Sequence, residues 1–141
     1  MFLKASLNDA KLIFNLRFEK TARKNSIYQR KISYLDHLKW YRKIINNKKD
    51  KILIFQKNKG YLRISNEKNR KFLSWNINKD LRQKGFGYKM LSEYLLSSKD
   101  NYFAIIKKSN LASIRLVKKV GFRYIKKIRD GILLYSFTKK N

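Results

Sequence analysis

Hydrophobic and polar residues follow two different periods along the chain, and these periods separate strands from helices. Three strand-like runs follow one another closely: Lys51 to Gln56, Tyr61 to Ser65 and Lys71 to Ile77. The links between them are short and rich in turn-forming residues, which is typical of hairpins. We therefore predict an antiparallel meander of three strands, and Phe2 to Ala5 predicts a short strand ahead of it.

Apolar residues three and four positions apart predict helices in much of the remaining chain. Helices of this kind follow Ser6 or Asn8, begin at Gly87, and follow the cap Asn110. Another begins at a Ser33-x-x-Asp capping box. Its predicted apolar side consists of Leu35, Leu38, Tyr41, Ile44 and Ile45. The polar stretch 20–30 has only a weak pattern and predicts a loop or an irregular helix.

The C-terminal part of the chain returns to strand-like patterns. Tyr102 to Ile106 is a run of strand-forming residues, and the runs Phe122 to Ile128 and Ile132 to Phe137 flank Asp130-Gly131. An Asp-Gly pair between two such runs is a strong hairpin signal. Strands thus alternate with helices, which predicts an α/β chain with a mixed sheet, folded as one domain over residues 1–141.

Composition excludes several kinds of site. The chain has no cysteine and one histidine, His37, which excludes disulfides, thiolate metal sites and multi-histidine metal centres, so we expect no metal cofactor. The longest apolar runs, such as Ile52 to Phe55, are far shorter than the roughly 20 residues of a membrane helix. We therefore expect a cytoplasmic protein that does not interact with membranes.

The net charge of +27, from 36 basic and 9 acidic residues, suggests an anionic partner. Nucleic acid, an anionic membrane surface or a polyanionic small molecule would each fit. Lys, Asn and Ile are abundant and share A/T-rich codons, so an A/T-rich genome could supply much of the excess. The lysines occur in pairs such as Lys48-Lys49 and form no long basic block. These facts favour a small anionic ligand over dedicated nucleic-acid binding.

A strand, a glycine-containing loop and a helix start follow one another between Phe72 and Tyr88. In the loop, Arg82 precedes Gly85 and Gly87, and glycines let a backbone approach a ligand closely. The free N–H groups and the positive dipole end of the helix then form a site for an anion such as a pyrophosphate. The pattern is neither a P-loop nor a dinucleotide-binding fingerprint. By itself it fits an ordinary connection equally well.

A second segment decides between these readings. Asn110 follows the next strand by three residues and opens a helix that ends at Gly121-Phe122. Together the two segments resemble the GCN5-related N-acetyltransferase (GNAT) superfamily, in which an Arg/Gln-x-x-Gly-x-Gly/Ala loop binds the pyrophosphate of acetyl-CoA. The resemblance extends to the element order over essentially the whole chain. It implies an acyltransferase with an α+β fold: a mixed, mostly antiparallel sheet of six to seven strands flanked by about four helices.

The resemblance also implies which residues bind acetyl-CoA. In the superfamily the strand before the loop splays from the next one and pairs with the cofactor's arm, which places Asn76 and Ile77 there. Asn110 and Ser113 belong to the helix that lines the same arm. The residues expected around the phosphates are Arg82, Gln83, Lys84, Gly85, Phe86, Gly87 and Tyr88.

The acid and base of the reaction are less well defined. Many members have a tyrosine, which protonates the departing thiolate, at the position occupied here by Val117. Either Tyr88 or Tyr94 takes that role, or the thiolate leaves without direct protonation. The strand ending at Ile77 carries no carboxylate, and Glu67 has the position of an exposed turn residue.

The segment from Ile32 to Tyr41 resembles the Ile-x-x-x-Glu-His-x-x-Trp-Phe segment of the PseH-like branch of the superfamily. That branch acetylates the 4-amino group of a UDP-linked aminosugar and tends to have an apolar residue where Val117 lies. The resemblance implies a catalytic role for His37, as a base. It also implies that Arg17 and His37 bind the substrate, and the indole rings of Trp40 and Trp75 are our candidates for stacking on its uracil or sugar ring. Phe18-Glu19 depart from the Asn-Asp of the branch.

The residues alone leave these roles open. A histidine on an amphipathic helix is often a hydrogen-bonded structural residue, and tryptophan side chains often pack in the core. Our first hypothesis is therefore an acetyl-CoA-dependent N-acetyltransferase of a nucleotide-linked aminosugar, and the superfamily allows a homodimer. The alternatives are a peptide or ribosomal-protein N-α-acetyltransferase and, in another class, a basic nucleic-acid-binding module without catalysis.

Overall fold

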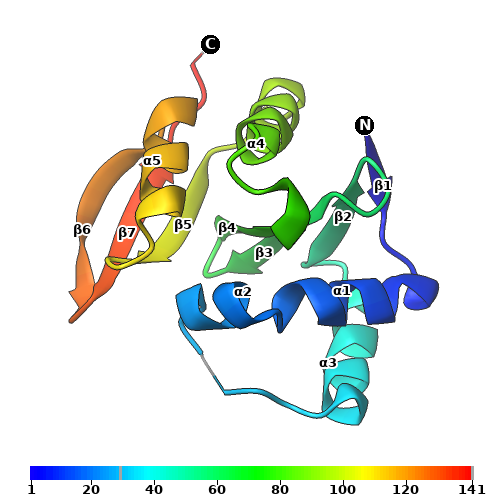
Figure 1. Cartoon of the computed structure of the whole chain (residues 1–141). Coiled ribbons are helices and arrows are strands. Elements are labelled where there is room, and N and C mark those ends of the chain that lie inside the picture. Colours follow the sequence, from blue (N-terminus) through cyan, green and yellow to red (C-terminus); the bar gives the residue numbers. More distant parts are fainter. Residues whose placement is uncertain (29, 141) are drawn as a thin grey trace.

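A computed structural model describes residues 1–28 and 30–140. Seven strands form one sheet in the order β1-β2-β3-β4-β5-β7-β6 (Figure 1). All neighbours are antiparallel except β4 and β5, which are parallel. The strands are β1 (Phe2–Lys4), β2 (Lys51–Phe55), β3 (Gly60–Glu67), β4 (Arg70–Ile77), β5 (Tyr102–Lys107), β6 (Arg123–Arg129) and β7 (Ile132–Phe137). The predicted meander and C-terminal hairpin are confirmed, and so is the mixed, mostly antiparallel sheet.

Five α-helices and two short 3₁₀ segments accompany the sheet within the described residues. They are η1 (Leu7–Asp9), α1 (Ala10–Arg17), α2 (Lys20–Asn25), α3 (Tyr34–Asn46), η2 (Lys79–Leu81), α4 (Phe86–Ser97) and α5 (Leu111–Val120). The short helix α2 lies in the stretch predicted as loop or irregular helix. With it, the number of α-helices exceeds the expected four or so. Position 29 of that stretch and position 141 lie outside the described residues.

Helix α3 begins where the capping box predicts, because the Ser33 hydroxyl accepts a hydrogen bond from the Asp36 N–H at 3.1 Å. Its buried side differs from the prediction. His37, Tyr41 and Ile44 are buried, whereas Leu35 is 69% exposed. Successive helical residues are about 100° apart, so Leu35, two positions before His37, points away from the sheet.

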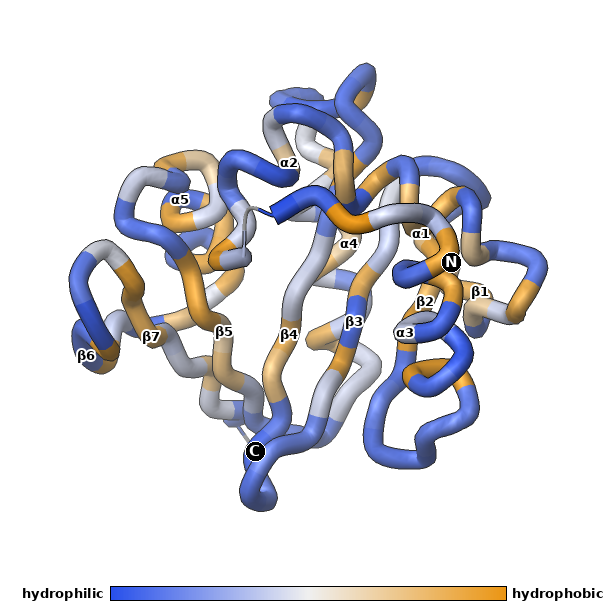
Figure 2. The backbone as a smooth tube through the Cα atoms, turned by 90° about the horizontal axis from the view of Figure 1, so that it is seen from below, coloured by the Kyte–Doolittle hydropathy of each residue, from blue (hydrophilic) through white to orange (hydrophobic). Residues whose placement is uncertain are grey.

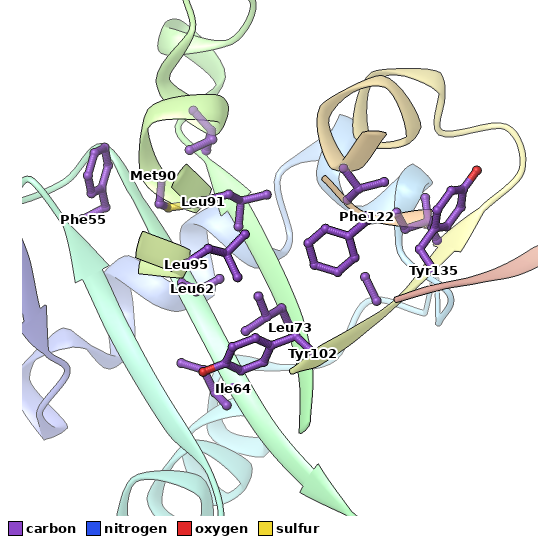
Figure 3. Close-up of a cluster of buried hydrophobic side chains, with 14 residues drawn as sticks. Phe55, Leu62, Ile64, Leu73, Met90, Leu91, Leu95, Tyr102, Phe122 and Tyr135 are labelled. Carbon is purple, nitrogen blue, oxygen red and sulfur yellow. The ribbon is translucent and has the colours of Figure 1, made fainter. Parts of the chain in front are cut away.

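The helices cover both faces of the sheet. Helices α4 and α5 pack on one face over a large apolar core that includes Leu62, Leu91 and Leu95 (Figure 3). Helices α1 and α3 pack on the other face, where Ile13 and Tyr41 contact a smaller core. Residues along a strand alternate between the faces, which explains why neighbours in β3 belong to different cores.

The two ends of the sheet are unequal. β1 is short, whereas β6 has seven residues, all of them exposed. Four of these seven are cations: Arg123, Lys126, Lys127 and Arg129. The register between β6 and β7 is also irregular at two places. Among the described residues, no helix is both long and apolar enough to cross a membrane.

Candidate active site

The parallel strands β4 and β5 are paired at one position only in the described register, Phe72 with Phe103. Both residues lie near the beginning of their strands. Figure 2 shows the two strands close together at that end and apart at the other. The C-terminal half of β4 therefore lies in the interior of the sheet but is not paired with β5 in this register.

The peptide groups on that free side belong to Trp75 and Ile77. The N–H of Asn78 donates to Lys59 O at 2.8 Å, toward β3. Because backbone groups alternate between the two sides of a strand, Asn76 also points its N–H and C=O toward β3. Trp75 and Ile77 then direct theirs toward β5. A ligand with amide groups can pair with this edge as an added strand would.

The free edge leads into the N-terminus of α4. The Asn78 side chain accepts from the Asp80 N–H at 3.1 Å and starts the turn of η2. The N-cap of α4 is Gly85, whose φ of +84° is left-handed and whose missing side chain provides no cap. The first bond into the helix is Lys89 N–H to Gly85 O at 3.0 Å. Three N–H groups, those of 86–88, thus have no acceptor within the helix.

The two loop glycines serve different purposes. A Cβ atom on Gly85 would meet nothing within 4 Å, so only the left-handed backbone conformation favours glycine there. A Cβ atom on Gly87 would lie 3.0 Å from the side chain of Leu116, so glycine there allows α4 to pack closely on α5. Only Gly85 faces open space, and a ligand can approach the helix N-terminus from that side.

Arg82 does not point at this helix N-terminus in the structure. Its guanidinium forms an ion pair with Glu19 at 2.6 Å, and Glu19 caps α2 by accepting from the N–H groups of Thr21 and Ala22. Burial alone would raise the pKa of the Glu19 carboxyl, but these hydrogen bonds and Arg82 lower it below its ordinary value. The ion pair fastens the loop to α2.

The other loop residues are arranged around the α4 N-terminus. Gln83 and Lys84 are exposed, and Phe86 is half-buried with the Lys59 ammonium 4.8 Å from its ring centre. Tyr88 is 41% exposed, and the Lys119 ammonium lies 4.5 Å from its ring. α5 therefore contributes a cation beside the start of α4.

Helix α5 is capped by its own side chain. Asn110 Oδ1 accepts from the Ser113 N–H at 3.2 Å, so both residues already have a role in the helix start. Val117 is fully buried. It therefore cannot reach solvent or a ligand, and no side chain at that position donates a proton.

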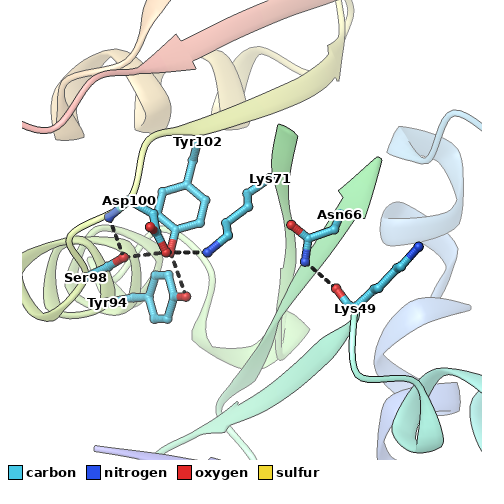
Figure 4. A network of polar contacts seen from close by, with 7 residues as sticks. All are labelled: Lys49, Asn66, Lys71, Tyr94, Ser98, Asp100 and Tyr102. Carbon is cyan, nitrogen blue, oxygen red and sulfur yellow. Dashed lines mark hydrogen bonds and ion pairs between the residues drawn. The ribbon is translucent and has the colours of Figure 1, made fainter. Parts of the chain in front are cut away.

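Tyr94 and Glu67 lie at the end of the sheet away from the loop. The Tyr94 hydroxyl shares a hydrogen bond of 2.9 Å with Tyr102, at the beginning of β5, and Tyr102 also contacts Ser98 (Figure 4). Burial and these bonds raise the pKa of Tyr94 above its ordinary value. Glu67 ends β3, at the turn where β4 begins. Of the two tyrosines proposed as acid, only Tyr88 is near the loop.

His37 is fully buried in a cage of aromatic rings. Its Nε2 lies 3.0 Å from Ala10 O and donates to it, while Nδ1 is buried without a hydrogen-bond partner among the described residues. Burial lowers the pKa of His37; the bond to Ala10 opposes this, and the nearby charge of Arg17 adds to it. The rings around it are Phe14, Phe18, Tyr34, Trp40 and Tyr41. This geometry favours the structural interpretation of His37.

The structure brings Arg17 and Trp40 together and keeps Trp75 apart. The Arg17 guanidinium lies 4.2 Å from the centre of the Trp40 ring, on the α1–α3 face. Trp75 packs against the large core beneath α4 and α5, on the other face. The two indoles therefore cannot stack on the same ligand ring.

One residue of this region was not singled out by the sequence. Arg63, in β3, also lies against Trp40, 5.2 Å from its ring centre. The sequence signal that was available is an arginine between two apolar residues of a predicted strand, Leu62 and Ile64. Within residues 1–28 and 30–140, no three His, Cys, Asp or Glu side chains are grouped so that they could hold a metal ion.

No protein-family model and no curated protein matches the chain. Solved structures do match it over nearly the whole length. The structure of yncA from Salmonella typhimurium with its cofactor acetyl-CoA is 19% identical, covers 100% of this chain and 94% of that one, and has a TM-score of 0.77. Spermidine N-acetyltransferase from Vibrio cholerae, in complex with CoA and spermine, is 16% identical with coverages of 97% and 94% and a TM-score of 0.82.

A third match is aminoglycoside acetyltransferase AAC(6')-Ib in complex with coenzyme A. It is 15% identical, covers 99% of this chain and 94% of that one, and has a TM-score of 0.80. At such identities the likeness establishes the fold. The predicted fold class is therefore confirmed.

Proposed function

We propose, from the GNAT fold of the chain, that it is an acetyl-CoA-dependent N-acetyltransferase whose acceptor is the amino group of a nucleotide-linked (UDP) aminosugar. The observation that carries the acetyltransferase part is the divergence of β4 from β5. It leaves a free strand edge that leads directly into an uncapped helix N-terminus. An ordinary strand–helix connection needs neither feature.

The residues present fit acetyl-CoA. The peptide groups of Trp75 and Ile77 would hold the amides of the pantetheine arm. The three free N–H groups at the start of α4 bind the pyrophosphate, with the positive dipole end behind them. Lys84 and Lys119 add positive charge nearby. When bound, acetyl-CoA supplies an acetyl thioester, which a neutral amine attacks directly.

The chain contributes positioning and charge stabilisation to the reaction. The Ile77 N–H, on the free edge of β4, would be available as a hydrogen-bond donor to the thioester oxygen. Holding both reactants against one strand edge supplies much of the rate. Tyr88 is the proposed acid for the leaving thiolate. His37 supports Arg17 and Trp40 from behind, since its ring has no exposed surface.

The acceptor part of the proposal is supported by the segment around His37. It resembles the corresponding segment of acetyltransferases for UDP-linked aminosugars. Arg17 and Trp40, the two substrate-binding residues that the structure brings together, provide a cation and an aromatic face, which suit a phosphate and a sugar or uracil ring. The fold does not favour the non-catalytic nucleic-acid-binding alternative.

The test of the cofactor site is a Gly85→Asp variant. Aspartate tolerates the left-handed conformation, and its carboxylate would lie at the helix N-terminus in competition with the pyrophosphate. We expect acetyl-CoA affinity, measured by calorimetry and thermal shift, to fall at least about 10-fold. Gly131→Asp is the matched control, because Gly131 also has a positive φ (+74°) and open space, in the β6–β7 turn.

Unchanged acetyl-CoA affinity in Gly85→Asp would refute the proposed phosphate site. The acceptor is tested by mass spectrometry of a UDP-linked 4-amino-sugar, incubated with acetyl-CoA and the wild-type chain. Acetylation of a peptide α-amine in place of the sugar would keep the cofactor site and reject the acceptor.

A further inference from the structure

Two arginines from distant parts of the sequence meet at one indole ring. Arg17 ends α1 and Arg63 lies in β3, and their guanidinium carbons are 4.2 and 5.2 Å from the centre of the Trp40 ring. Burial lowers the pKa of the Arg17 guanidinium below its ordinary value, and the positive charge of Arg63 adds to this. Two positive charges beside one ring repel each other, and a bound anion would reduce that repulsion.

The positive charges of Arg17 and Arg63 are only partly neutralised by nearby carboxylates. Arg17 Nη1 and Arg63 Nε are buried and have no hydrogen-bond partner among the described residues. Asp50 approaches Arg63 at 3.6 Å, and Glu19 is paired with Arg82. One carboxylate thus serves two guanidiniums. A buried donor without an acceptor costs about 1–3 kcal/mol, which a bound anion would remove.

A neighbouring tyrosine cannot supply the missing charge. Tyr61, in β3, is buried near the same two arginines, and burial raises the pKa of its hydroxyl, so it stays neutral. Its oxygen accepts a hydrogen bond of 2.8 Å from the Asn76 side chain. Asn76 directly precedes Ile77, whose N–H lies on the free edge of β4. The arginine cluster is therefore adjacent to the position at which acetyl transfer is proposed.

Arg17 also lines a pocket of about 270 Å³ that is open to solvent. Arg23 and Arg30 line it too, together with the rings of Phe18 and Tyr28, and none of the described residues that line it is acidic. The volume is at the lower end of small-molecule sites, enough for part of a ligand. Three guanidiniums and aromatic rings around one hollow suit an anionic group carried on a ring.

We propose that Arg17 and Arg63 bind an acidic group of the acceptor, a phosphate or a carboxylate, and thereby select anionic amines and reject polyamines and aminoglycosides. This inference rests on the proposed acetyltransferase function and adds Arg63 as a specificity-determining residue. The enzymes with the same fold that act on spermidine and aminoglycosides take polycations. A site with unneutralised guanidiniums repels such substrates and attracts the opposite charge.

The experiment compares acceptors that differ in charge, at saturating acetyl-CoA. Glucosamine 6-phosphate and a UDP-linked 4-amino-sugar represent phosphate, muramic acid represents carboxylate, and glucosamine and spermidine carry no acidic group. We expect kcat/KM for at least one acidic acceptor to exceed that of glucosamine by about 10-fold or more, and no turnover of spermidine. Comparison of the phosphate-bearing acceptors with the carboxylate-bearing one shows which acidic group the site binds.

The variants are Arg17→Gln, Arg63→Gln and Arg63→Lys, with Arg42→Gln on the exposed side of α3 as the matched control. Each glutamine variant should lower kcat/KM for the acidic acceptor about 10- to 100-fold, mainly through KM, and that for glucosamine by less than about 3-fold. Arg63→Lys keeps the charge but loses the planar fork, so it should show an intermediate loss. Arg42→Gln should match the wild type for every acceptor.

Acetyl-CoA affinity, measured on the same proteins, distinguishes failure of the arginine subsite from failure of the proposed acetyltransferase function. Normal affinity together with equal losses for charged and uncharged acceptors, or a preference for spermidine, would overturn the arginine subsite and leave the acetyltransferase standing. Failure of the wild type to bind acetyl-CoA would overturn both. Thermal unfolding of Arg63→Lys and Arg63→Gln shows whether a loss reflects folding, since a folded Arg63→Lys retains a testable site.

Discussion

The two faces of the sheet differ in the polarity of the residues that they bury. Under α4 and α5 the buried cluster is almost entirely hydrophobic, and the buried hydroxyl of Tyr102 is hydrogen-bonded to Tyr94 and Ser98. Under α1 and α3 the apolar residues surround His37, two guanidiniums with unpaired donors, and Tyr41, whose hydroxyl donates to Ser6 O at 2.6 Å. The first face holds the fold together. The second retains polar groups at a cost in stability, which is typical of a binding surface.

The largest effect is expected from truncating the apolar face. Leu91, on α4, is fully buried in the large core, so Leu91→Ala should lower the free energy of unfolding by about 2–5 kcal/mol. Urea denaturation measures this. On the same helix, Leu96 is 81% exposed, and Leu96→Ala should change stability by less than about 0.5 kcal/mol. Similar losses in the two variants would contradict the packing of α4.

A smaller, pH-dependent effect is expected on the other face, from His37. Its pKa in the folded state lies below the ordinary value of 6.5, so below pH 6.5 the unfolded chain binds more protons than the folded one. Stability should therefore be fully present above pH 6.5 and fall by up to about 1.4 kcal/mol per pH unit as the pH drops toward the folded pKa.

Because His37 is the chain's single histidine, His37→Gln isolates its contribution. Glutamine keeps a donor for Ala10 O and removes the titration. Denaturation curves between pH 7 and 5 should lose most of their slope in this variant. A slope that persists would locate the pH dependence elsewhere.

The smallest effect on stability should come from Tyr61→Phe. This variant removes the hydrogen bond with Asn76 and keeps the packing of the ring. We expect a loss of about 1 kcal/mol, measured by denaturation. Tyr124, 51% exposed on β6, provides the comparison, and Tyr124→Phe should be neutral. Equal stability of both variants would show that the polar bond on the α1–α3 face contributes nothing.

The sequence predicted the strands and most helices because local period and turn chemistry determine them. The meander, the Asp130-Gly131 hairpin and the caps Ser33 and Asn110 are all decided within a few residues. Leu35 was misplaced because the true stripe on α3 includes His37, which a search for apolar residues leaves out. Helix α2 was missed as a definite element because its signal is a single capping side chain, Glu19.

The site was predicted less completely, for a physical reason. The position of the loop follows from local glycines, but the partners of its side chains lie far away in the sequence, as with Arg82 and Glu19. The same holds for Arg17 and Arg63, which only the sheet register brings together. The cofactor and acceptor residues remain proposals, which the variants above test.

The strand at the far end of the sheet has a consequence for the behaviour of the protein in solution. β6 offers an unpaired edge and exposes Tyr124, Ile125 and Ile128, which is what a second chain needs in order to add a strand. Its four cations oppose such addition between two copies, since like charges would face each other.

That repulsion reaches about 10 Å at 0.1 M salt and only about 3 Å at 1 M. We therefore expect the chain to remain dispersed in dilute buffer and to self-associate as salt is added. Association held together by surface salt bridges would instead weaken as salt is added. The ionic strength of the medium would then control the solubility of the protein.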